Sequence, residues 1–159
     1  MIDFQTLLST LVRHNVKFIL IGGAAAVAHG AARLTEDLDI LYERSHANLE
    51  QLIAALAAYK PYLRGVPEGL PFQWHADTLA RGLNFTLTTN FGDVDLFGDI
   101  PGGGTYHDLA AGAIEIDLFE NRCLCLSVDQ LIAAKRATGR PKDLEAIAEL
   151  EAIRDEAGS

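Results

Sequence analysis

The sequence has few cysteines and few basic residues. Cys123 and Cys125 are the two cysteines among 159 residues, and a cysteine metal site would need further ligands at suitable spacing, so we interpret both as buried thiols. Lysine and arginine number 13 against 22 acidic residues, which gives a formal net charge of -9. Affinity for nucleic acid comes mainly from Lys and Arg that neutralise phosphates. This balance argues against non-specific nucleic-acid binding, and we expect no DNA partner.

The sequence also lacks a long hydrophobic run. Its longest apolar stretch, around residues 18–28, is interrupted by glycines and is too short to span a bilayer. The N-terminus lacks the basic flank of a secretory signal. We therefore expect a cytoplasmic protein without a membrane partner.

The overall composition is typical of a folded protein, with 49% hydrophobic and 22% charged residues. A chain of 159 residues is long enough for one domain with a real core and too short for two ordinary ones. We expect a single domain over residues 1–159, in which residues 127–155 form a C-terminal helical part.

The hydrophobic patterning predicts an α/β (α+β) fold, in which a small mixed β-sheet is flanked by helices. The expected helices cover residues 4–14, 24–29, 46–59, 127–137 and 141–155. The expected strands cover residues 18–21, 35–43, 83–89, 93–97 and 113–119. The proline-containing segment 60–73 is expected to be a loop.

Two aspartates one residue apart form the first candidate site. Residues i and i+2 of a strand share a face about 6 to 7 Å apart, so the carboxylates of Asp37 and Asp39 can converge while Leu38 enters the core. Apart from Arg33, the sequence places little cationic charge near them, so they would repel each other unless a cation lies between them. Such oxygen ligands suit Mg²⁺ or Mn²⁺. A solvated edge strand with an acidic outer face is the alternative.

A glycine pair precedes these acids. Gly22 and Gly23 end a buried strand and open a helix, where free backbone N–H groups and the helix dipole favour a phosphate. The surrounding residues match neither the phosphate-binding P-loop nor the dinucleotide-binding glycine motif. Arg33 and Thr35 come just before the acidic strand and are candidate nucleotide-binding residues. Arg33 either steers phosphate or pairs with a neighbouring acid such as Asp37.

A third acid can join the set from the predicted hairpin. In "GDVDLF" the acids Asp93 and Asp95 again alternate with apolar residues. We choose Asp95 because it lies deeper in the strand, whereas Asp93 is next to the turn. Two divalent ions about 3.5 to 4 Å apart could then clamp an in-line nucleotidyl displacement, with the third carboxylate helping to activate the attacking hydroxyl.

Three blocks of the sequence carry a family resemblance, namely "IGGAAAVAHGAARLTEDLDI", "GDVDLF" and "SVDQLIAAKRATGRPKDLEAIAEL". The first resembles the nucleotidyltransferase superfamily signature, hG[GS] followed by a helix and Dh[DE]h, which belongs to the DNA polymerase beta-like fold. The second resembles the strand that carries the third carboxylate of that superfamily. The third is similar to the lysine and R-x-K-D elements of AbiEii-type nucleotidyltransferases, a branch that includes toxins of bacterial toxin–antitoxin systems.

The resemblance implies a role for each motif residue. Gly22 and Gly23 would hold the triphosphate of a nucleotide such as ATP, Asp37 and Asp39 the two metal ions, and Asp95 the metal that activates the acceptor.

The AbiEii-like part of the resemblance concerns the C-terminal half of the site. It implies that Lys135 contacts phosphate and that Asp143 lies near the nucleotide pocket. An ammonium group can act as a point charge on a phosphate. The alternative is that Lys135 belongs to a solvated helix junction.

Three functions remain open at this stage. The first is an enzyme that moves a nucleoside monophosphate from a metal-bound nucleoside triphosphate to a hydroxyl of a small molecule, a protein or an RNA end. The second is a non-catalytic binding or regulatory partner with the same fold, for example an antitoxin-like protein with a cognate partner. The third is a metal-dependent phosphohydrolase, which would use water as the nucleophile.

Overall fold

The computed structural model describes residues 2–31, 35–67, 69 and 71–157, and leaves the side chains of residues 142, 143 and 157 undescribed. Within these residues the strands form one seven-stranded mixed sheet in the order β3-β4-β5-β2-β1-β7-β6. In chain order they are β1 (Phe18–Leu20), β2 (Asp37–Tyr42), β3 (Tyr62–Leu63), β4 (Phe85–Thr89), β5 (Gly92–Phe97), β6 (Ile114–Leu118) and β7 (Asn121–Cys125). The predicted mixed sheet flanked by helices is therefore confirmed.

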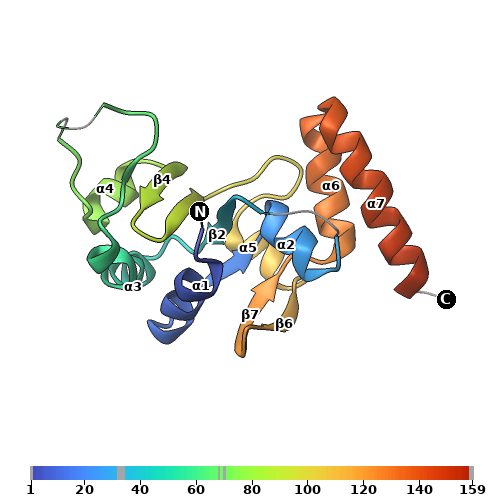
Figure 1. The fold of residues 1–159 in the computed structure, drawn as a ribbon, viewed down its shortest axis with the longest axis horizontal. Helices are drawn as coiled ribbons and strands as arrows, with labels where there is room; N and C mark the ends of the chain where they lie inside the picture. The colour runs from blue at the N-terminus through green and yellow to red at the C-terminus, as the bar shows by residue number, and fades with distance from the viewer. Residues whose placement is uncertain (1, 32–34, 68, 70, 158–159) are drawn as a thin grey trace.

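Helices pack on the sheet and also lie at both ends of the molecule. They are α1 (Phe4–Arg13), α2 (Gly22–Ala28), α3 (His46–Leu56), the 3-10 turn η1 (Ala57–Tyr59), α4 (Ala76–Arg81), α5 (Tyr106–Ala110), α6 (Val128–Thr138) and α7 (Pro141–Ala157). Figure 1 shows α3, α4 and β4 at one end of the molecule and α6 with α7 at the other. Helix α2 contacts both α6 and β2, the central strand of the sheet. None of the described helices is long and apolar enough to cross a membrane.

The predicted elements differ from the structure at β3, α4, α5 and β7, none of which is among the expected helices and strands. The expected loop at 60–73 contains the two-residue strand β3, which pairs antiparallel with β4 through Tyr62 and Thr88. Helices α4 and α5 were not predicted, because elements of six and five residues are too short to show a helical period. The prediction of a loop was wrong at β3, and this strand supplies a residue next to the candidate site.

The central strands explain how the sheet is anchored. Leu38 and Ile40 of β2 are fully buried, as are Val94 and Leu96 of the neighbouring β5. Burial of such side chains contributes about 1.5 to 3 kcal/mol each. Because residues alternate between the faces of a strand, this apolar face fixes the aspartates of β2 and β5 on the opposite face.

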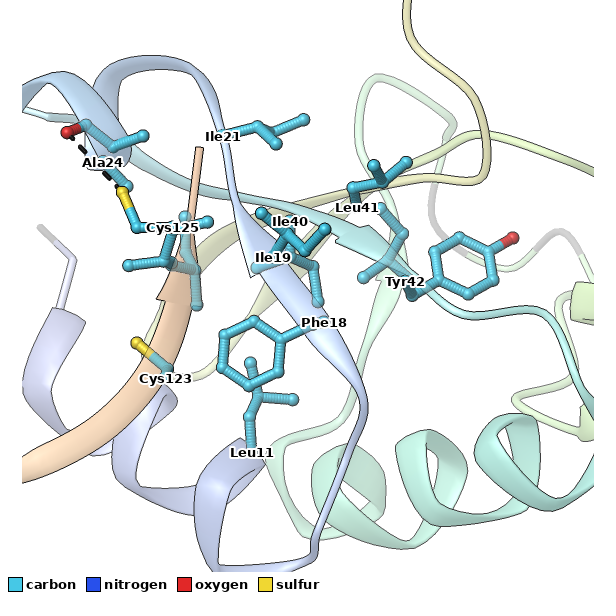
Figure 2. Close-up of a cluster of buried hydrophobic side chains, with 14 of the residues drawn as sticks. Leu11, Phe18, Ile19, Ile21, Ala24, Ile40, Leu41, Tyr42, Cys123 and Cys125 are labelled. Atoms are coloured by element: carbon cyan, nitrogen blue, oxygen red, sulfur yellow. Dashed lines mark hydrogen bonds between the residues drawn. The ribbon is translucent and has the colours of Figure 1, made fainter. Parts of the chain in front are cut away.

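The two cysteines lie in the hydrophobic core, as predicted. Figure 2 shows Cys123 and Cys125 of β7 among apolar side chains that include Phe18 and Ile19 of β1. The Cys125 thiol donates a weak hydrogen bond to the Ala25 carbonyl at 4.0 Å. Burial raises the pKa of Cys123 to about 11 and that of Cys125 to about 12. Both thiols are therefore protonated and unreactive at neutral pH.

Candidate functional site

Parallel pairing of β2 with β5 brings the aspartates together. The register sets Asp39 level with Asp95 and Asp37 level with Asp93. One carboxylate oxygen from each of Asp37, Asp39 and Asp95 lies within 4.8 Å of the other two. We call these three residues the acidic triad. Asp93 lies outside the triad, although it shares the same face of the sheet.

Asp39 has the least compensated charge of the triad. Its Oδ1 atom is buried and has no hydrogen-bond partner among the described residues. Burial, together with the charges of Asp37 and Asp95, raises the pKa of Asp39 to about 7, while Lys135 opposes the shift. A buried carboxylate oxygen with no donor is costly unless a cation reaches it. This atom therefore marks the position at which a cation would be bound most favourably.

Gly22 allows the backbone to approach Asp39. Its φ angle is +60°, and a Cβ at this position would overlap the Asp39 Oδ2 atom. Only glycine adopts this conformation without strain and also leaves the carboxylate its space. Gly23 differs, because a Cβ there would lie 3.4 Å from Thr35 Oγ1, an ordinary contact distance. The two predicted glycines thus have different roles, and the first of them shapes the site.

Arg64 is the site residue that the sequence prediction missed. Its guanidinium hydrogen-bonds Asp95 Oδ1 through Nη2, while Nη1 lies 3.7 Å from Asp37 Oδ2 and Nε lies 3.5 Å from Asp93 Oδ2. Burial and the adjacent Asp37 carboxyl raise the pKa of Asp95, although Arg64 opposes this shift. The expectation that little cationic charge except Arg33 lies near the acids was therefore wrong.

The structure explains why Arg64 was not predicted as a site residue. Arg64 directly follows β3, and its backbone N–H donates to the Thr86 carbonyl of β4 at 2.9 Å. That pairing carries the side chain onto the face that holds Asp95, since Thr86 is the register partner of Asp95. In sequence Arg64 is far from every member of the triad and lies in the segment expected to be a loop. A two-residue strand gives no periodic signal that could have found it.

Lys135 and Asp39 of the triad line the same cavity. This cavity has a volume of about 210 Å³, and its lining includes Gly22, Asp39, Lys135 and Arg140. The remaining lining is mostly apolar and comes from residues 97–101, from α6, and from Ile21 and Leu126. The Lys135 charge acts on Asp39. Lys135 thus lies close enough to the site for its charge to act on Asp39, and its role at a phosphate stays a prediction.

Of the other three predicted nucleotide-binding residues, the structure describes the side chain of Thr35. Thr35 donates its hydroxyl to the Asp37 carbonyl at 2.8 Å, so it holds the start of β2 in place. Arg33 lies outside the described residues. Asp143 belongs to α7, and its side chain is among those not described. The assigned roles of Arg33 and Asp143 therefore remain predictions.

The triad has the features of a divalent cation site. Its donors are all carboxylate oxygens, which are the hard ligands that Mg²⁺ and Mn²⁺ prefer. The three oxygens converge, and the buried Oδ1 of Asp39 lacks a partner within the described structure. The residues present therefore fit a divalent metal.

Known structures share this architecture. The lincosamide antibiotic adenylyltransferase LnuA, solved with lincomycin bound, matches with a TM-score of 0.62 at 17% identity, over 96% of this chain and 98% of that one. A candidate nucleotidyltransferase of Thermotoga maritima, TM1012, matches with a TM-score of 0.59 at 14% identity, over 94% of both chains. ANT(2")-Ia in complex with adenylyl-2"-tobramycin matches with a TM-score of 0.57 at 13% identity, over 96% and 93%.

These matches agree on one fold. No protein-family model and no curated protein sequence matches the chain. The structural matches nevertheless span almost its whole length and that of the solved proteins. The chain therefore has the nucleotidyltransferase fold that the sequence resemblance predicted.

Proposed function

We propose that this protein is a metal-dependent nucleotidyltransferase that moves a nucleoside monophosphate from a nucleoside triphosphate to a hydroxyl group. The observation that carries the proposal is the convergence of Asp37, Asp39 and Asp95 on one face of the sheet, with an unpartnered Asp39 oxygen within the described residues. The fold adds support, because ANT(2")-Ia was solved with an adenylylated antibiotic.

Each residue of the site would have its own role in the transfer reaction. The triad would hold two divalent ions, Mg²⁺ or Mn²⁺, which would stabilise the charge that develops on the transferred phosphoryl group. The backbone of Gly22 and Gly23 and the Lys135 ammonium would hold the triphosphate. Gly22 and Lys135 line the same cavity as Asp39, and Gly23 directly follows Gly22. Roles for Arg33 and Asp143 at the nucleotide belong to the same proposal.

The reaction balances without a redox partner. The acceptor hydroxyl oxygen forms a bond to the α-phosphorus, the bond between that phosphorus and the bridging oxygen breaks, and pyrophosphate leaves. Asp95 would accept the hydroxyl proton, and two observations support this role: its carboxyl belongs to the triad, and burial raises its pKa.

The similar solved structures indicate which class of acceptor should be tested first. LnuA and ANT(2")-Ia are solved with small antibiotics, so a small hydroxylated molecule is the first acceptor to test, ahead of a protein side chain or an RNA end. The net charge of -9 makes RNA the least favoured acceptor. We place the reaction in the cytoplasm, where nucleoside triphosphates are available.

The similarity to AbiEii-type enzymes supports a finer proposal, that the protein acts in a toxin–antitoxin pair with a cognate partner protein. Induced expression of the wild-type chain should then arrest bacterial growth, and Asp37→Asn/Asp39→Asn should not. Normal growth with active wild-type protein would dismiss the toxin role without touching the transferase activity.

The central test is nucleotidyl transfer. Purified protein is incubated with Mg²⁺, each α-labelled nucleoside triphosphate and cell extract separated into RNA, protein and small-molecule fractions. Label in one fraction that is lost in Asp37→Asn/Asp39→Asn would identify nucleotide and acceptor class. Release of labelled monophosphate with no labelled acceptor would indicate hydrolysis, and no reaction with any nucleotide would contradict the enzyme proposal.

A further inference from the structure

Arg64 divides its contacts unevenly over the acids of the site. Its ion pairs are with Asp37 and Asp95, which belong to the triad, and with Asp93, which does not. Asp39 instead lies against Gly22 and lines the cavity that Lys135 also lines. The triad thus has a side that faces the glycine turn and a side already approached by a guanidinium.

The guanidinium lies where it conflicts with a metal ion. A divalent ion held by the triad would draw on the carboxylates of Asp37 and Asp95, which already face Arg64: Asp37 Oδ2 lies 3.7 Å from Nη1, and Asp95 Oδ1 is hydrogen-bonded to Nη2. Two cations in contact with the same oxygens repel each other strongly in a partly buried site. The Arg64 side chain in its present position therefore opposes the binding of a divalent ion by Asp37 and Asp95.

The structure also provides a place to which the side chain can move. Strand pairing anchors the Arg64 backbone to Thr86, but the side chain is 33% exposed. Asp93 lies 3.5 Å from Nε, is 37% exposed, and is level with Asp37, two residues from Asp95 toward the hairpin turn. Thr88 pairs with Asp93 on the adjacent strand and is exposed. A small rotation toward Asp93 would free the triad and keep one ion pair.

We propose that Arg64 is an internal counter-ion that holds Asp37 and Asp95 together in the metal-free protein and yields them to a divalent ion by withdrawing to Asp93. The proposal rests on the metal-binding part of the proposed function. Arg64 is then a positioning residue, because it keeps mutually repelling carboxylates in the geometry that the metal requires. It also sets the metal concentration at which the site fills.

The test measures metal binding without nucleotide, so it does not depend on transfer activity. Mn²⁺ is titrated into the full chain and followed by calorimetry and by the electron paramagnetic resonance signal of free Mn²⁺. Arg64→Gln keeps most of the side-chain volume and removes the charge. We expect it to bind Mn²⁺ about 5- to 100-fold more tightly than the wild type, as for a coupling between two sites of ordinary strength, and Arg64→Lys to stay close to the wild type.

Thermal unfolding supplies the second readout. Metal-free Arg64→Gln should melt several degrees below the wild type, because the triad then lacks its counter-ion, and the deficit should disappear at saturating Mn²⁺. A residue with only a structural role would lower the melting temperature equally with and without metal. The matched control is Arg122→Gln, which also loses ion pairs with two acids, Glu115 and Asp117, on the remote edge of the sheet. It should leave Mn²⁺ affinity unchanged.

Asp93→Asn tests the withdrawal separately. With no acid to receive Arg64, metal binding should weaken several-fold, although Asp93 is not in the triad. Equal or weaker Mn²⁺ binding by Arg64→Gln than by the wild type would overturn the proposal, as would unchanged affinity in Asp93→Asn.

The two proposals fail in different ways. One outcome is that Arg64→Gln binds Mn²⁺ more tightly, that Asp37→Asn/Asp39→Asn abolishes this binding, and that no nucleotide supports transfer. This outcome would support the counter-ion proposal and contradict the transferase proposal. Transfer activity combined with Mn²⁺ affinity that is insensitive to Arg64 would do the reverse.

Discussion

Two acids near opposite ends of β2 have opposite surroundings. Glu43, directly after the strand, is almost completely buried and accepts a hydrogen bond from the Ser45 backbone N–H. Its Oε2 atom lies 3.7 Å from Lys17 Nζ and 3.9 Å from His107 Nε2. Burial by itself would raise the pKa of Glu43, but these donors and charges outweigh burial and lower it. Asp39, four residues earlier, has a pKa raised to about 7.

The difference separates a structural acid from a candidate functional one. Glu43 uses its charge within the fold: its partners hold the turn between β2 and α3, and Asn48 donates to its carbonyl at 2.7 Å. Asp39 keeps a buried oxygen without a partner within the described residues. A protein that tolerates such an atom gains from the group only when a ligand supplies the missing partner.

The comparison predicts its largest effect for Asp39→Asn. Transfer activity should fall about 10³-fold or more, because loss of a metal ligand removes several kcal/mol of transition-state stabilisation. The metal-free protein should be at least as stable as the wild type, since one repelling charge is gone. Labelled-nucleotide transfer and thermal unfolding in EDTA measure the two quantities. A clear loss of metal-free stability would show that Asp39 is a structural acid like Glu43.

The glycine pair offers a matched test of the backbone around Asp39. Gly22→Ala should reduce transfer about 100-fold and destabilise the protein by about 1 to 3 kcal/mol, because its φ of +60° is strained for alanine and its Cβ would displace Asp39. Gly23→Ala should leave stability within about 0.5 kcal/mol, since its Cβ meets Thr35 at an ordinary distance. Equal effects of the two substitutions would contradict a special role for Gly22.

Stability as a function of pH should distinguish the two acids by sign. Between pH of about 4 and 7, folded metal-free protein holds a proton on Asp39 that the unfolded chain, with a pKa of 3.8, releases. The contribution of Asp39 to stability should therefore fall as pH rises through this range, by about 4 kcal/mol in total for a pKa raised from 3.8 to about 7. The contribution of Glu43 has the opposite sign and is lost as pH falls through its lowered pKa.

Denaturant unfolding in EDTA at a series of pH values measures this slope. Asp39→Asn should flatten the fall between pH 4 and 7, and saturating Mg²⁺ should remove it, because the metal favours the ionised carboxylate. A wild-type slope that Asp39→Asn leaves unchanged would assign the titration to another group.

The smallest effect concerns Glu43. Glu43→Ala should cost about 1 to 2 kcal/mol of stability, because the Ser45 N–H loses its acceptor and Lys17 its partner. Transfer activity per folded molecule should stay near the wild-type value, since this side chain lies beyond the far end of β2 from Asp37. Urea unfolding at neutral pH, with activity measured on the same samples, checks both. A large loss of activity in the folded protein would erase the distinction between the two acids.

Much of the fold could be read from local patterns. Alternation of acids with Leu38 and Ile40 predicted β2, and the two strands around residues 90–92 predicted the β4–β5 hairpin, because these signals lie within a few neighbouring residues. The helix expected over residues 127–137 is present as α6, and its start has a capping box formed by Ser127 and Gln130. Elements of two to six residues, such as β3, α4 and α5, escaped prediction because they are stabilised by their neighbours and not by their own periodicity.

The sequence by itself determined the chemistry available at the site: two aspartates two residues apart, a third in the hairpin, and a glycine pair at the end of a buried strand. Spacing along one or two strands is enough to place these residues on a common face. Only the tertiary structure decided how their charge is balanced. The parallel register of β2 with β5 leaves the Asp39 oxygen unpartnered among the described residues, and pairing of β3 with β4 brings Arg64 to Asp95. Electrostatic contacts depend on distance in space, and these partners are far apart in the chain.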